Sequence, residues 1–347
     1  MKELLTIRNI RKSFDHKSIA ALEDISFSLC EDEVVSIIGP SGTGKSTLVK
    51  IIAQLLEQDS GEILYKSKSD LSNFKDEFSY VPQELSLDNS LTVYENIGTN
   101  LNEENEEKRH HRIRDMIEVF GLQYKDHKYP TELSTGQKSR VEMAKALVSS
   151  PELLILDEPF ANLDRSLRDE IKSELVEILK ERKISALIVT HNLEDAFSHS
   201  DKILVLGDGI IKQFSNARDV YTHPADAWVA KFTGPVNLMA GTVKTSNGNF
   251  SQTNKLDTFE VSCFDESIKD GDFSYMLIRP EACRISSEGK YKGKVKKIIH
   301  LGAFYEVWVQ IGGIEKFKIS ASLSDKIEMN RAVKFDILLD QCQLLRI

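Results

Sequence analysis

The sequence predicts an α/β domain built on a mostly parallel sheet, followed by a small all-β domain. A glycine-rich loop at residues 39–47 directly follows the apolar run 34–38, which is the order of a strand and a phosphate-binding loop. A second apolar run, residues 153–156, has the length of one buried strand and ends in two acids. Beyond Gly234 the chain changes to short alternating runs separated by turn residues.

The glycine-rich loop has the pattern of a P-loop. Three glycines let the backbone curl so that successive N–H groups point at a phosphate chain. The ammonium of Lys45 reaches the β- and γ-phosphate oxygens, and the hydroxyl of Ser46 is a ligand for Mg²⁺. A helix expected over residues 48–56 directs its positive N-terminal end toward the anion. We therefore expect ATP and Mg²⁺ to bind here, against Gly39, Pro40, Ser41, Gly42, Thr43, Gly44, Lys45, Ser46 and Thr47.

Two acids, Asp157 and Glu158, directly follow the second buried strand. The carboxyl end of a strand in a doubly wound sheet lies beside the P-loop, where ligands bind. Asp157 is therefore expected to hold Mg²⁺, directly or through water. Glu158 is expected to polarise the attacking water as a general base. The alternative is a solvated surface pair, which the preceding apolar run and the following Pro159 disfavour.

Two helices are predicted around these motifs. Ser134 and Gln137 have the spacing of a capping box, so a helix is expected to begin at residue 135. Taken alone, this pattern indicates an ordinary capped helix, and its position between the P-loop and the two acids favours a functional role. A second helix is predicted over residues 165–182, with an apolar stripe that packs on the sheet and carries no chemistry.

The other predicted elements complete the two domains. Strands are expected around residues 5–10 and 25–29, helices from about 91 to 148, and alternating strands and helices again from residue 153 to the strand 202–206. The later alternating runs, such as residues 258–261, 305–309 and 333–338, indicate a small β-barrel. The length of 347 residues favours two domains, which we place at residues 1–234 and 235–347.

Composition narrows the kinds of partner and compartment. The chain has 45 Lys and Arg against 54 Asp and Glu, a net charge of −9, which predicts no nonspecific affinity for nucleic acid or anionic lipid. The four cysteines are far apart and form no CxxC pair, so we expect buried free thiols in a reducing compartment. The start of the chain lacks the pattern of a secretion signal, and no apolar stretch has the length of a membrane span.

Over roughly residues 3–234, the order of these motifs resembles the ATP-binding subunit of an ATP-binding-cassette (ABC) transporter. Residues 39–47 resemble the family's Walker A motif, and residues 153–158 its Walker B motif. Residues 133–137 resemble the signature, with Thr135 where glycine is usual. The remaining matches are Gln83 in Tyr80-Val81-Pro82-Gln83-Glu84 (the Q-loop), Asn162-Leu163-Asp164 (the D-loop), Thr190-His191 (the switch histidine) and a helical subdomain over about residues 88–150.

The resemblance implies a role for each matching residue. Phe14 is expected to stack on adenine, although the family more often has tyrosine there, and its structural alternative is a core position. Gln83 is expected to contact Mg²⁺ and the attacking water. His191 is expected to bond the γ-phosphate, with a strand-end histidine as its alternative, and Asn192 replaces an aspartate common after it. Ser134 and Gly136 are expected to cap the γ-phosphate of the opposite protomer, and Gln137 and Asp164 are also expected to bind nucleotide.

The C-terminal part resembles the transport-associated OB-like (TOBE) domain of one importer group. The resemblance lies in Ile278-Arg279-Pro280-Glu281 and in residues 293–302. That group imports sugars, polyamines, ferric iron, sulfate, molybdate and similar solutes. The implied protein is an ATPase subunit on the cytoplasmic face of the inner membrane, paired with a second ATPase subunit. It would drive integral membrane permease subunits, and a solute-binding protein would be an indirect partner.

Three other functions remain as alternatives. A soluble ABC ATPase of translation or repair is disfavoured because such relatives carry tandem cassettes or long coiled-coil insertions. An exporter subunit is disfavoured by the C-terminal barrel. The third alternative is a regulator or solute sensor based mainly on that barrel.

Overall fold

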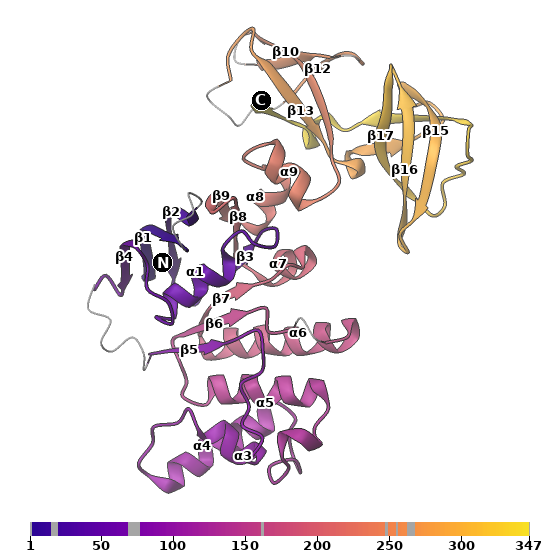
Figure 1. The fold of residues 1–347 in the computed structure, drawn as a ribbon. Helices are drawn as coiled ribbons and strands as arrows, with labels where there is room; N and C mark the ends of the chain where they lie inside the picture. Colours follow the sequence, from indigo (N-terminus) through magenta and orange to yellow (C-terminus); the bar gives the residue numbers. More distant parts are fainter. Residues whose placement is uncertain are drawn as a thin grey trace. The chain divides into compact units, whose positions relative to one another are not determined.

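The computed structural model describes residues 2–14, 20–68, 77–160, 163–246, 249–254, 256–261 and 268–346. The chain forms two compact units, Met1–Ala217 and Arg218–Ile347, and each is described here by itself (Figure 1). The sequence placed the domain boundary later, at residue 234. Helix α9 (Ala227–Thr233) and most of α8 (Ala217–Thr222) therefore belong to the second compact unit.

A six-stranded sheet forms the centre of the first unit. Its strand order is β5-β6-β7-β3-β8-β9, with the first five strands parallel and β9 antiparallel to β8. The four inner strands, β6, β7, β3 and β8, are short and almost wholly buried, as strands covered on both faces must be. The bounds of the six strands are β5 (Phe78–Val81), β6 (Leu153–Asp157), β7 (Ser185–Val189), β3 (Val34–Ile38), β8 (Lys202–Gly207) and β9 (Ile210–Asn216).

One face of this sheet is covered by helix α1 and by a second, antiparallel sheet. Helix α1 (Lys45–Ile52) begins and ends earlier than the predicted 48–56, because Gly44 is already its N-cap. The antiparallel sheet has the order β2-β1-β4, with β1 (Glu3–Ser13), β2 (Ala20–Cys30) and β4 (Ser60–Tyr65). Ile37, Leu48 and Ile155 belong to the core that these elements enclose.

The other face is covered by helices, which confirms the predicted helical subdomain. These helices are α3 (Val93–Gly98), α4 (Glu106–Val119) and α5 (Thr135–Leu147), with α6 (Arg165–Arg182) against the sheet and α7 (Leu193–His199) after β7. Leu154 and Leu156 of β6 point into this second core, whereas Leu153 and Ile155 point into the first. Alternation along β6 thus separates α5 from α1, as Figure 1 also shows.

The second unit begins with α8 and α9, and its described remainder consists of strands and two short 3₁₀ turns. Its strands form two five-stranded antiparallel sheets, β12-β11-β10-β13-β19 and β14-β18-β15-β16-β17, that share one core. The three alternating runs used for the prediction lie in β12, β16 and β18. The bounds are β10 (Asn237–Ser246), β11 (Asn249–Thr253), β12 (Thr258–Glu260), β13 (Phe273–Ile278), β14 (Cys283–Ile285), β15 (Tyr291–His300), β16 (Phe304–Ile311), β17 (Ile314–Ser322), β18 (Ala332–Ile337) and β19 (Gln343–Arg346).

Arg279 explains why α8 and α9 belong to this unit. Its side chain is only 4 % exposed and donates hydrogen bonds to the carbonyls of Ala230 (2.8 Å) and Tyr221 (2.9 Å). It also donates to the hydroxyl of Thr233 at 3.0 Å, and its guanidinium stacks on the Tyr221 ring. Burial lowers the pKa of Arg279 without removing its charge. One buried cation therefore joins both helices to the residue that follows β13.

The cysteines differ from the prediction at one position. Cys283 and Cys342 are free and buried, as expected, but Cys30 is only half-buried. Cys263 lies outside the described residues. Within the part of the chain that the structure describes, no helix combines the length and apolarity of a membrane span.

Candidate active site

The P-loop follows β3 and is held tightly by its neighbours. A Cβ at Gly39 would lie 2.1 Å from the carbonyl oxygen of Leu206, so only glycine fits between β3 and β8. Gly44 has φ 97° and caps α1, and a Cβ there would lie 2.5 Å from the carbonyl oxygen of Ala21. Both glycines are therefore required by backbone packing as well as by the approach of a ligand.

Lys45 is the first residue of α1 and lies back over the loop. Its side chain is buried, and Nζ donates to the carbonyl oxygens of Gly39 (2.9 Å) and Pro40 (2.8 Å). Burial lowers the pKa of Lys45, and the charges of Glu158 and Asp157 partly offset that effect. The ammonium thus lies among loop carbonyls that a phosphate oxygen would replace as its acceptors.

Ser46 and Asp157 meet although 111 positions separate them. The hydroxyl of Ser46 donates to Oδ1 of Asp157 at 2.9 Å, and the Tyr80 hydroxyl donates to Oδ2 at 3.4 Å. Burial raises the pKa of the Asp157 carboxyl, and the Ser46 hydrogen bond opposes this rise. Burial, together with the Asp157 charge, raises the pKa of Tyr80. A hydroxyl and a carboxylate oxygen at contact distance are a donor set that suits Mg²⁺.

Glu158 has a left-handed backbone, with φ 50°. Such a conformation is uncommon for a residue other than glycine and is concentrated at functional sites. The N–H of Glu158 donates to the carbonyl of Val189 at 3.1 Å, and its carboxylate lies 3.1 Å from Nδ1 of His191. The Glu158 side chain is 19 % exposed and the His191 side chain 57 %. The turn after β6 therefore directs Glu158 toward His191, which follows β7.

Gln83 and Phe14 reach the same edge from other elements. Gln83 is exposed and follows β5, whose Val81 pairs with Leu156, so it lies at the strand end beside Asp157. Phe14 follows β1 and is 48 % exposed, which contradicts the alternative of a core position. The preceding residue, Ser13, pairs with the first residue of β2. The carbonyl oxygen of the next residue of β2, Ala21, packs against Gly44 of the P-loop.

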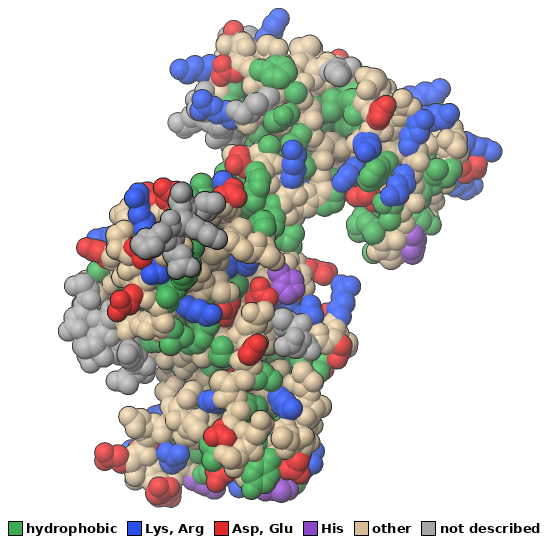
Figure 2. Space-filling view, viewed as in Figure 1, with side chains coloured by type: hydrophobic (Ala, Val, Ile, Leu, Met, Phe, Trp, Pro, Cys, Tyr) green, Lys and Arg blue, Asp and Glu red, His purple; other side chains and the backbone are tan. Residues whose placement is uncertain are grey.

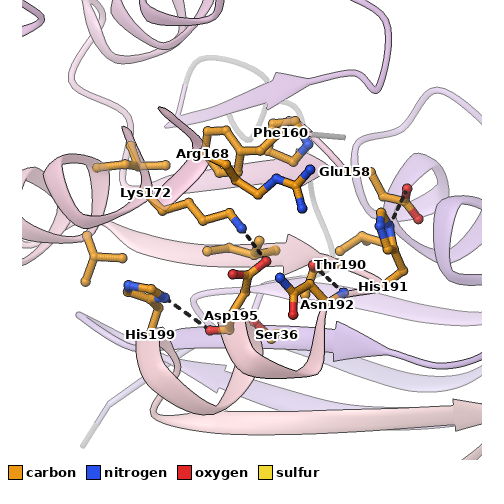
Figure 3. A pocket seen from close by; sticks show the side chains of 15 residues that line it. Ser36, Glu158, Phe160, Arg168, Lys172, Thr190, His191, Asn192, Asp195 and His199 are labelled. Carbon is orange, nitrogen blue, oxygen red and sulfur yellow. Dashed lines mark hydrogen bonds and ion pairs between the residues drawn. The ribbon is translucent and has the colours of Figure 1, made fainter. Parts of the chain in front are cut away.

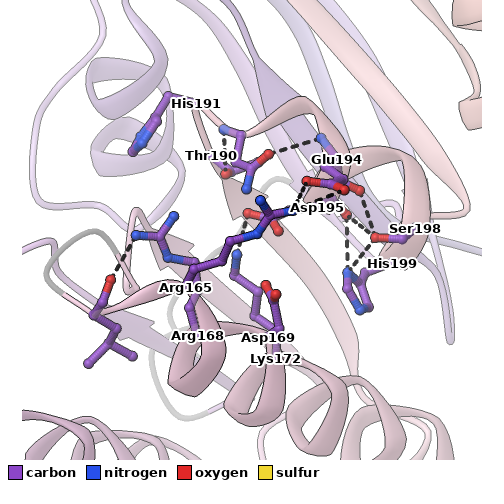
Figure 4. Close-up of polar contacts among 12 residues, drawn as sticks. Arg165, Arg168, Asp169, Lys172, Thr190, His191, Glu194, Asp195, Ser198 and His199 are labelled. Atoms are coloured by element: carbon purple, nitrogen blue, oxygen red, sulfur yellow. Dashed lines mark hydrogen bonds and ion pairs between the residues drawn. The ribbon is translucent and has the colours of Figure 1, made fainter. Parts of the chain in front are cut away.

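A pocket of about 540 Å³, including its open mouth, lies behind Glu158 and His191 (Figure 3). Helix α6 forms one wall and α7 another, and the lining combines apolar side chains such as Phe160, Leu175 and Ile188 with polar and charged ones. At its floor Lys172 of α6 forms an ion pair with Asp195 of α7 (Figures 3 and 4). Burial lowers the pKa of Lys172, and the bond to Asp195 opposes that shift.

The predicted capping box is confirmed at the start of α5. The Ser134 hydroxyl accepts from the N–H of Gln137 at 3.3 Å, and Gln137 Oε1 accepts from the N–H of Ser134 at 3.1 Å. Thr135 is the first helical residue, is exposed, and is not among the residues with positive φ. A Cβ at Gly136 would lie 2.3 Å from Cδ2 of Leu167, so this glycine lets α5 approach α6.

The structure does not bring the signature residues to the P-loop of the same chain. Ser134 and Gly136 begin α5 on one face of the sheet, whereas α1 packs on the other. Asp164 caps α6, its Oδ1 accepting from the N–H of Leu167 at 3.1 Å. Asn162, also part of the predicted D-loop, lies outside the described residues. The P-loop, Gln83, Asp157, Glu158 and His191 thus form one group, and the signature lies apart from it.

Sequence reasoning missed two side chains of this region. Tyr80 was noted only as part of the strand before Gln83, yet its hydroxyl bonds Asp157. Lys172 lies in a helix to which the sequence assigned no chemistry, yet it is buried against Asp195. A lysine on the apolar stripe of α6 is the one signal that the sequence offered for it.

The fold and this group of residues define an ATP-binding-cassette ATPase. A family model described as ABC transporter matches residues 22–161, and one described as TOBE domain matches residues 276–345. The chain belongs to the ABC transporter family and is an ATP-binding, ATP-hydrolysing subunit of the importer type with a C-terminal TOBE domain.

Similar proteins include two curated importer subunits. The spermidine/putrescine import ATP-binding protein PotA of Borrelia garinii subsp. bavariensis is 33 % identical over 314 residues, 89 % of each chain. The molybdate/tungstate import ATP-binding protein WtpC of Pyrococcus abyssi is 33 % identical over 320 residues, 90 % of each chain.

Two solved structures resemble the first unit. cbiO1 from Clostridium perfringens, part of the ABC transporter complex cbiONQ, has a TM-score of 0.59 and 29 % identity, covering 63 % of this chain and 91 % of its own. The ATP-binding cassette MJ0796, in a dimeric post-hydrolysis state bound to ADP and Pi, has a TM-score of 0.56 and 27 % identity. That match covers 62 % of this chain and 99 % of the MJ0796 chain.

Proposed function

We propose that this subunit hydrolyses Mg·ATP at the P-loop edge of the sheet and thereby drives separate membrane permease subunits. The observation that carries the proposal is the convergence of Ser46 from α1, Asp157 and Glu158 from the end of β6, and His191 from the turn after β7. Gln83 and Phe14 approach the same edge. Phosphate-binding loops, acids at strand ends and a nearby histidine together suit phosphoryl transfer to water.

The residues around the P-loop bind and orient the nucleotide. Lys45 exchanges its bonds to Gly39 and Pro40 for bonds to phosphate oxygens, because a charged acceptor is the stronger partner. The backbone N–H groups of the loop and of the start of α1 donate to the same phosphates. Phe14 offers an exposed ring for the adenine.

Ser46, Asp157 and Gln83 are the residues that would hold Mg²⁺. In the described part of the chain, no cluster of three or more His, Cys, Asp or Glu side chains forms a metal cage. This suits Mg²⁺, which takes one or two protein oxygens and fills its other positions with water and phosphate oxygens. When bound, the metal neutralises charge that develops on the phosphates.

Glu158 accepts the proton of the attacking water, and His191 positions the γ-phosphate. The 3.1 Å contact between the two side chains holds the carboxylate at the strand edge rather than in solvent. The left-handed backbone of Glu158 aims the side chain there, since an ordinary extended residue would continue the direction of β6.

A second copy of the subunit completes the site. Ser134, Gly136 and Gln137 begin α5 on the face of the sheet away from α1, so they serve the phosphates of another protomer. Asp164 takes part in the same contact. The N–H groups at the start of α5 then stabilise the transferred phosphoryl group, and hydrolysis requires the dimer.

The proposed setting is the cytoplasmic face of the inner membrane, with the subunit bound peripherally to its permease. The proposed solute is a polyamine, because several of the similar importer subunits are spermidine/putrescine import proteins. Molybdate or tungstate is the second candidate, since WtpC is equally identical. Uptake of labelled spermidine and of molybdate, compared between cells with and without the gene, decides between them. A loss confined to molybdate uptake contradicts the polyamine proposal.

Glu158→Gln tests the site itself. We expect Mg·ATP binding to persist while turnover falls by about 10² to 10⁴-fold, the usual effect of removing a general base. Lys45→Ala should instead weaken nucleotide binding, because it removes a charge-assisted bond to phosphate. Glu194→Gln is the matched control, being an exposed acid on the neighbouring helix α7. Normal turnover in Glu158→Gln excludes Glu158 as the base.

A further inference from the structure

The sheet β14-β18-β15-β16-β17 has a strongly basic outer face in a chain whose net charge is −9. We name this the lysine face. Figure 2 shows Lys and Arg side chains gathered over the region of β15, β16 and β17. Alternation along the strands and the pairing register place six lysines on it: Lys292, Lys294, Lys297, Lys316, Lys318 and Lys334.

Trp308 of β16 is the centre of the lysine face. Its ring centroid lies 4.8 Å from Nζ of Lys297, 5.7 Å from Nζ of Lys318 and 5.9 Å from Nζ of Lys316. The indole N–H donates to Oε1 of Glu306 at 2.7 Å. Three ammonium groups therefore gather on one aromatic ring, with one nearby carboxylate that already accepts a hydrogen bond.

The arrangement carries uncompensated positive charge. Among the described residues, none of the six lysines forms an ion pair with a carboxylate. Lys292 lies directly opposite Lys334 in the register of β15 and β18, where like charges are destabilising. The acids that share the face are Glu306 and the half-buried Asp336. An anionic partner would relieve this repulsion.

One end of the same face is apolar. Phe304, four residues before Trp308 on β16, points outward and is 40 % exposed. Leu301 in the β15–β16 turn is 51 % exposed, and Leu323, next to the Ser322 that pairs with Phe304, is 49 % exposed. An exposed apolar group beside charged residues is typical of a protein interaction site.

We propose that the lysine face binds an acidic segment of a partner protein. Carboxylates would lie over the lysines around Trp308, and apolar side chains would pack on Leu301, Phe304 and Leu323. Outward lysines on one strand are about 7 Å apart, which matches alternate side chains of an extended acidic peptide. Nucleic acid fits less well, because ammonium groups cover the Trp308 ring on which a base would otherwise stack.

Trp308 provides a direct probe of binding. The chain has two tryptophans, so Trp228→Phe leaves Trp308 as the only one. In this background we would titrate a peptide of about twelve residues that alternates Glu with Ser and ends in two leucines, a length that spans the face when extended. We expect saturable fluorescence change that weakens with added salt. A peptide with Gln in place of Glu should not bind.

Matched variants separate the lysine face from general charge. Lys297→Gln/Lys316→Gln/Lys318→Gln should weaken peptide binding at least about tenfold, from about 1 kcal/mol or less per lost contact. The control Lys244→Gln/Lys269→Gln/Lys326→Gln removes the same charge from exposed lysines of the same unit and should bind normally. Equal thermal midpoints in the two triple variants show that both are folded.

Three results would overturn the proposal. The first is no binding of the acidic peptide by the parent protein. The second is equal weakening in both triple variants. The third is tighter binding of oligothymidylate or of phosphatidylglycerol vesicles than of the peptide, which would assign the face to nucleic acid or to lipid.

Discussion

The ion pair between Lys172 and Asp195 provides a quantitative test of how α6 stabilises α7, the helix that follows His191. Its side chains are only 8 % and 13 % exposed, and the pair joins α6 to α7, the helix that follows His191. Replacing Asp195 with Ala leaves a buried ammonium without a partner. Removing one partner of a fully buried ion pair lowers the free energy of unfolding by about 3 to 5 kcal/mol. Because this pair is slightly exposed, we expect a loss of about 3 kcal/mol.

The molecule supplies its own control for this measurement. Arg165 and Glu194 join the same two helices (Figure 4), but they are 79 % and 75 % exposed. Glu194→Ala should therefore cost no more than about 1 kcal/mol. The double replacement Lys172→Met/Asp195→Leu should recover most of the lost stability, because it leaves no unpaired buried charge between α6 and α7.

Urea unfolding measures these effects in one unit at a time. Both tryptophans, Trp228 and Trp308, lie in the second compact unit, so tryptophan fluorescence reports that unit. Most helices lie in the first unit, which circular dichroism therefore follows. We expect Asp195→Ala to move the dichroism midpoint down by about 1 M urea and to leave the fluorescence midpoint in place. Equal shifts for Asp195→Ala and Glu194→Ala would refute the reasoning from burial.

Three further predictions concern the signature, the cysteines and the domain boundary. Thr135 begins α5 without positive φ, so Thr135→Gly should change turnover by less than about tenfold, whereas Ser134→Arg should abolish turnover. Steady-state ATPase assays measure both effects. A protein that is inactive until Thr135 is replaced by glycine would contradict this prediction. Burial raises the pKa of the Cys342 thiol to about 12, so in a Cys263→Ser background Ellman's reagent at pH 8 should modify Cys30 first. A fast phase that persists after Cys30→Ser rejects this order. A chain of residues 1–217 should fold and bind Mg·ATP. A chain of residues 1–234 should aggregate more, because its helix α9 lacks the contacts with Arg279 and Leu277. Equal light scattering from the two chains would contradict this domain boundary.

The elements that depend on local interactions were predictable from the amino-acid sequence. Residues 39–47 after a buried apolar run identified the P-loop, because glycine conformation and helix-end charge act over a few neighbouring residues. The capping box at Ser134 and Gln137 was confirmed for the same reason, since both hydrogen bonds join residues three apart. Period-two alternation likewise located strands such as β16 and β18.

Tertiary structure alone decided the features that depend on which strands become neighbours. Tyr80 reaches Asp157 because β5 pairs with β6, and Glu158 meets His191 because β6 pairs with β7. The sheet order is a long-range property, and no local pattern carries it. Arg279 likewise joins α8 and α9 to the second unit, because it donates hydrogen bonds to carbonyls more than forty positions earlier in the chain. Ala230, one of these acceptors, is 49 residues away. The candidate functional residues were thus predictable from the sequence, whereas their interaction partners depend on packing between distant segments.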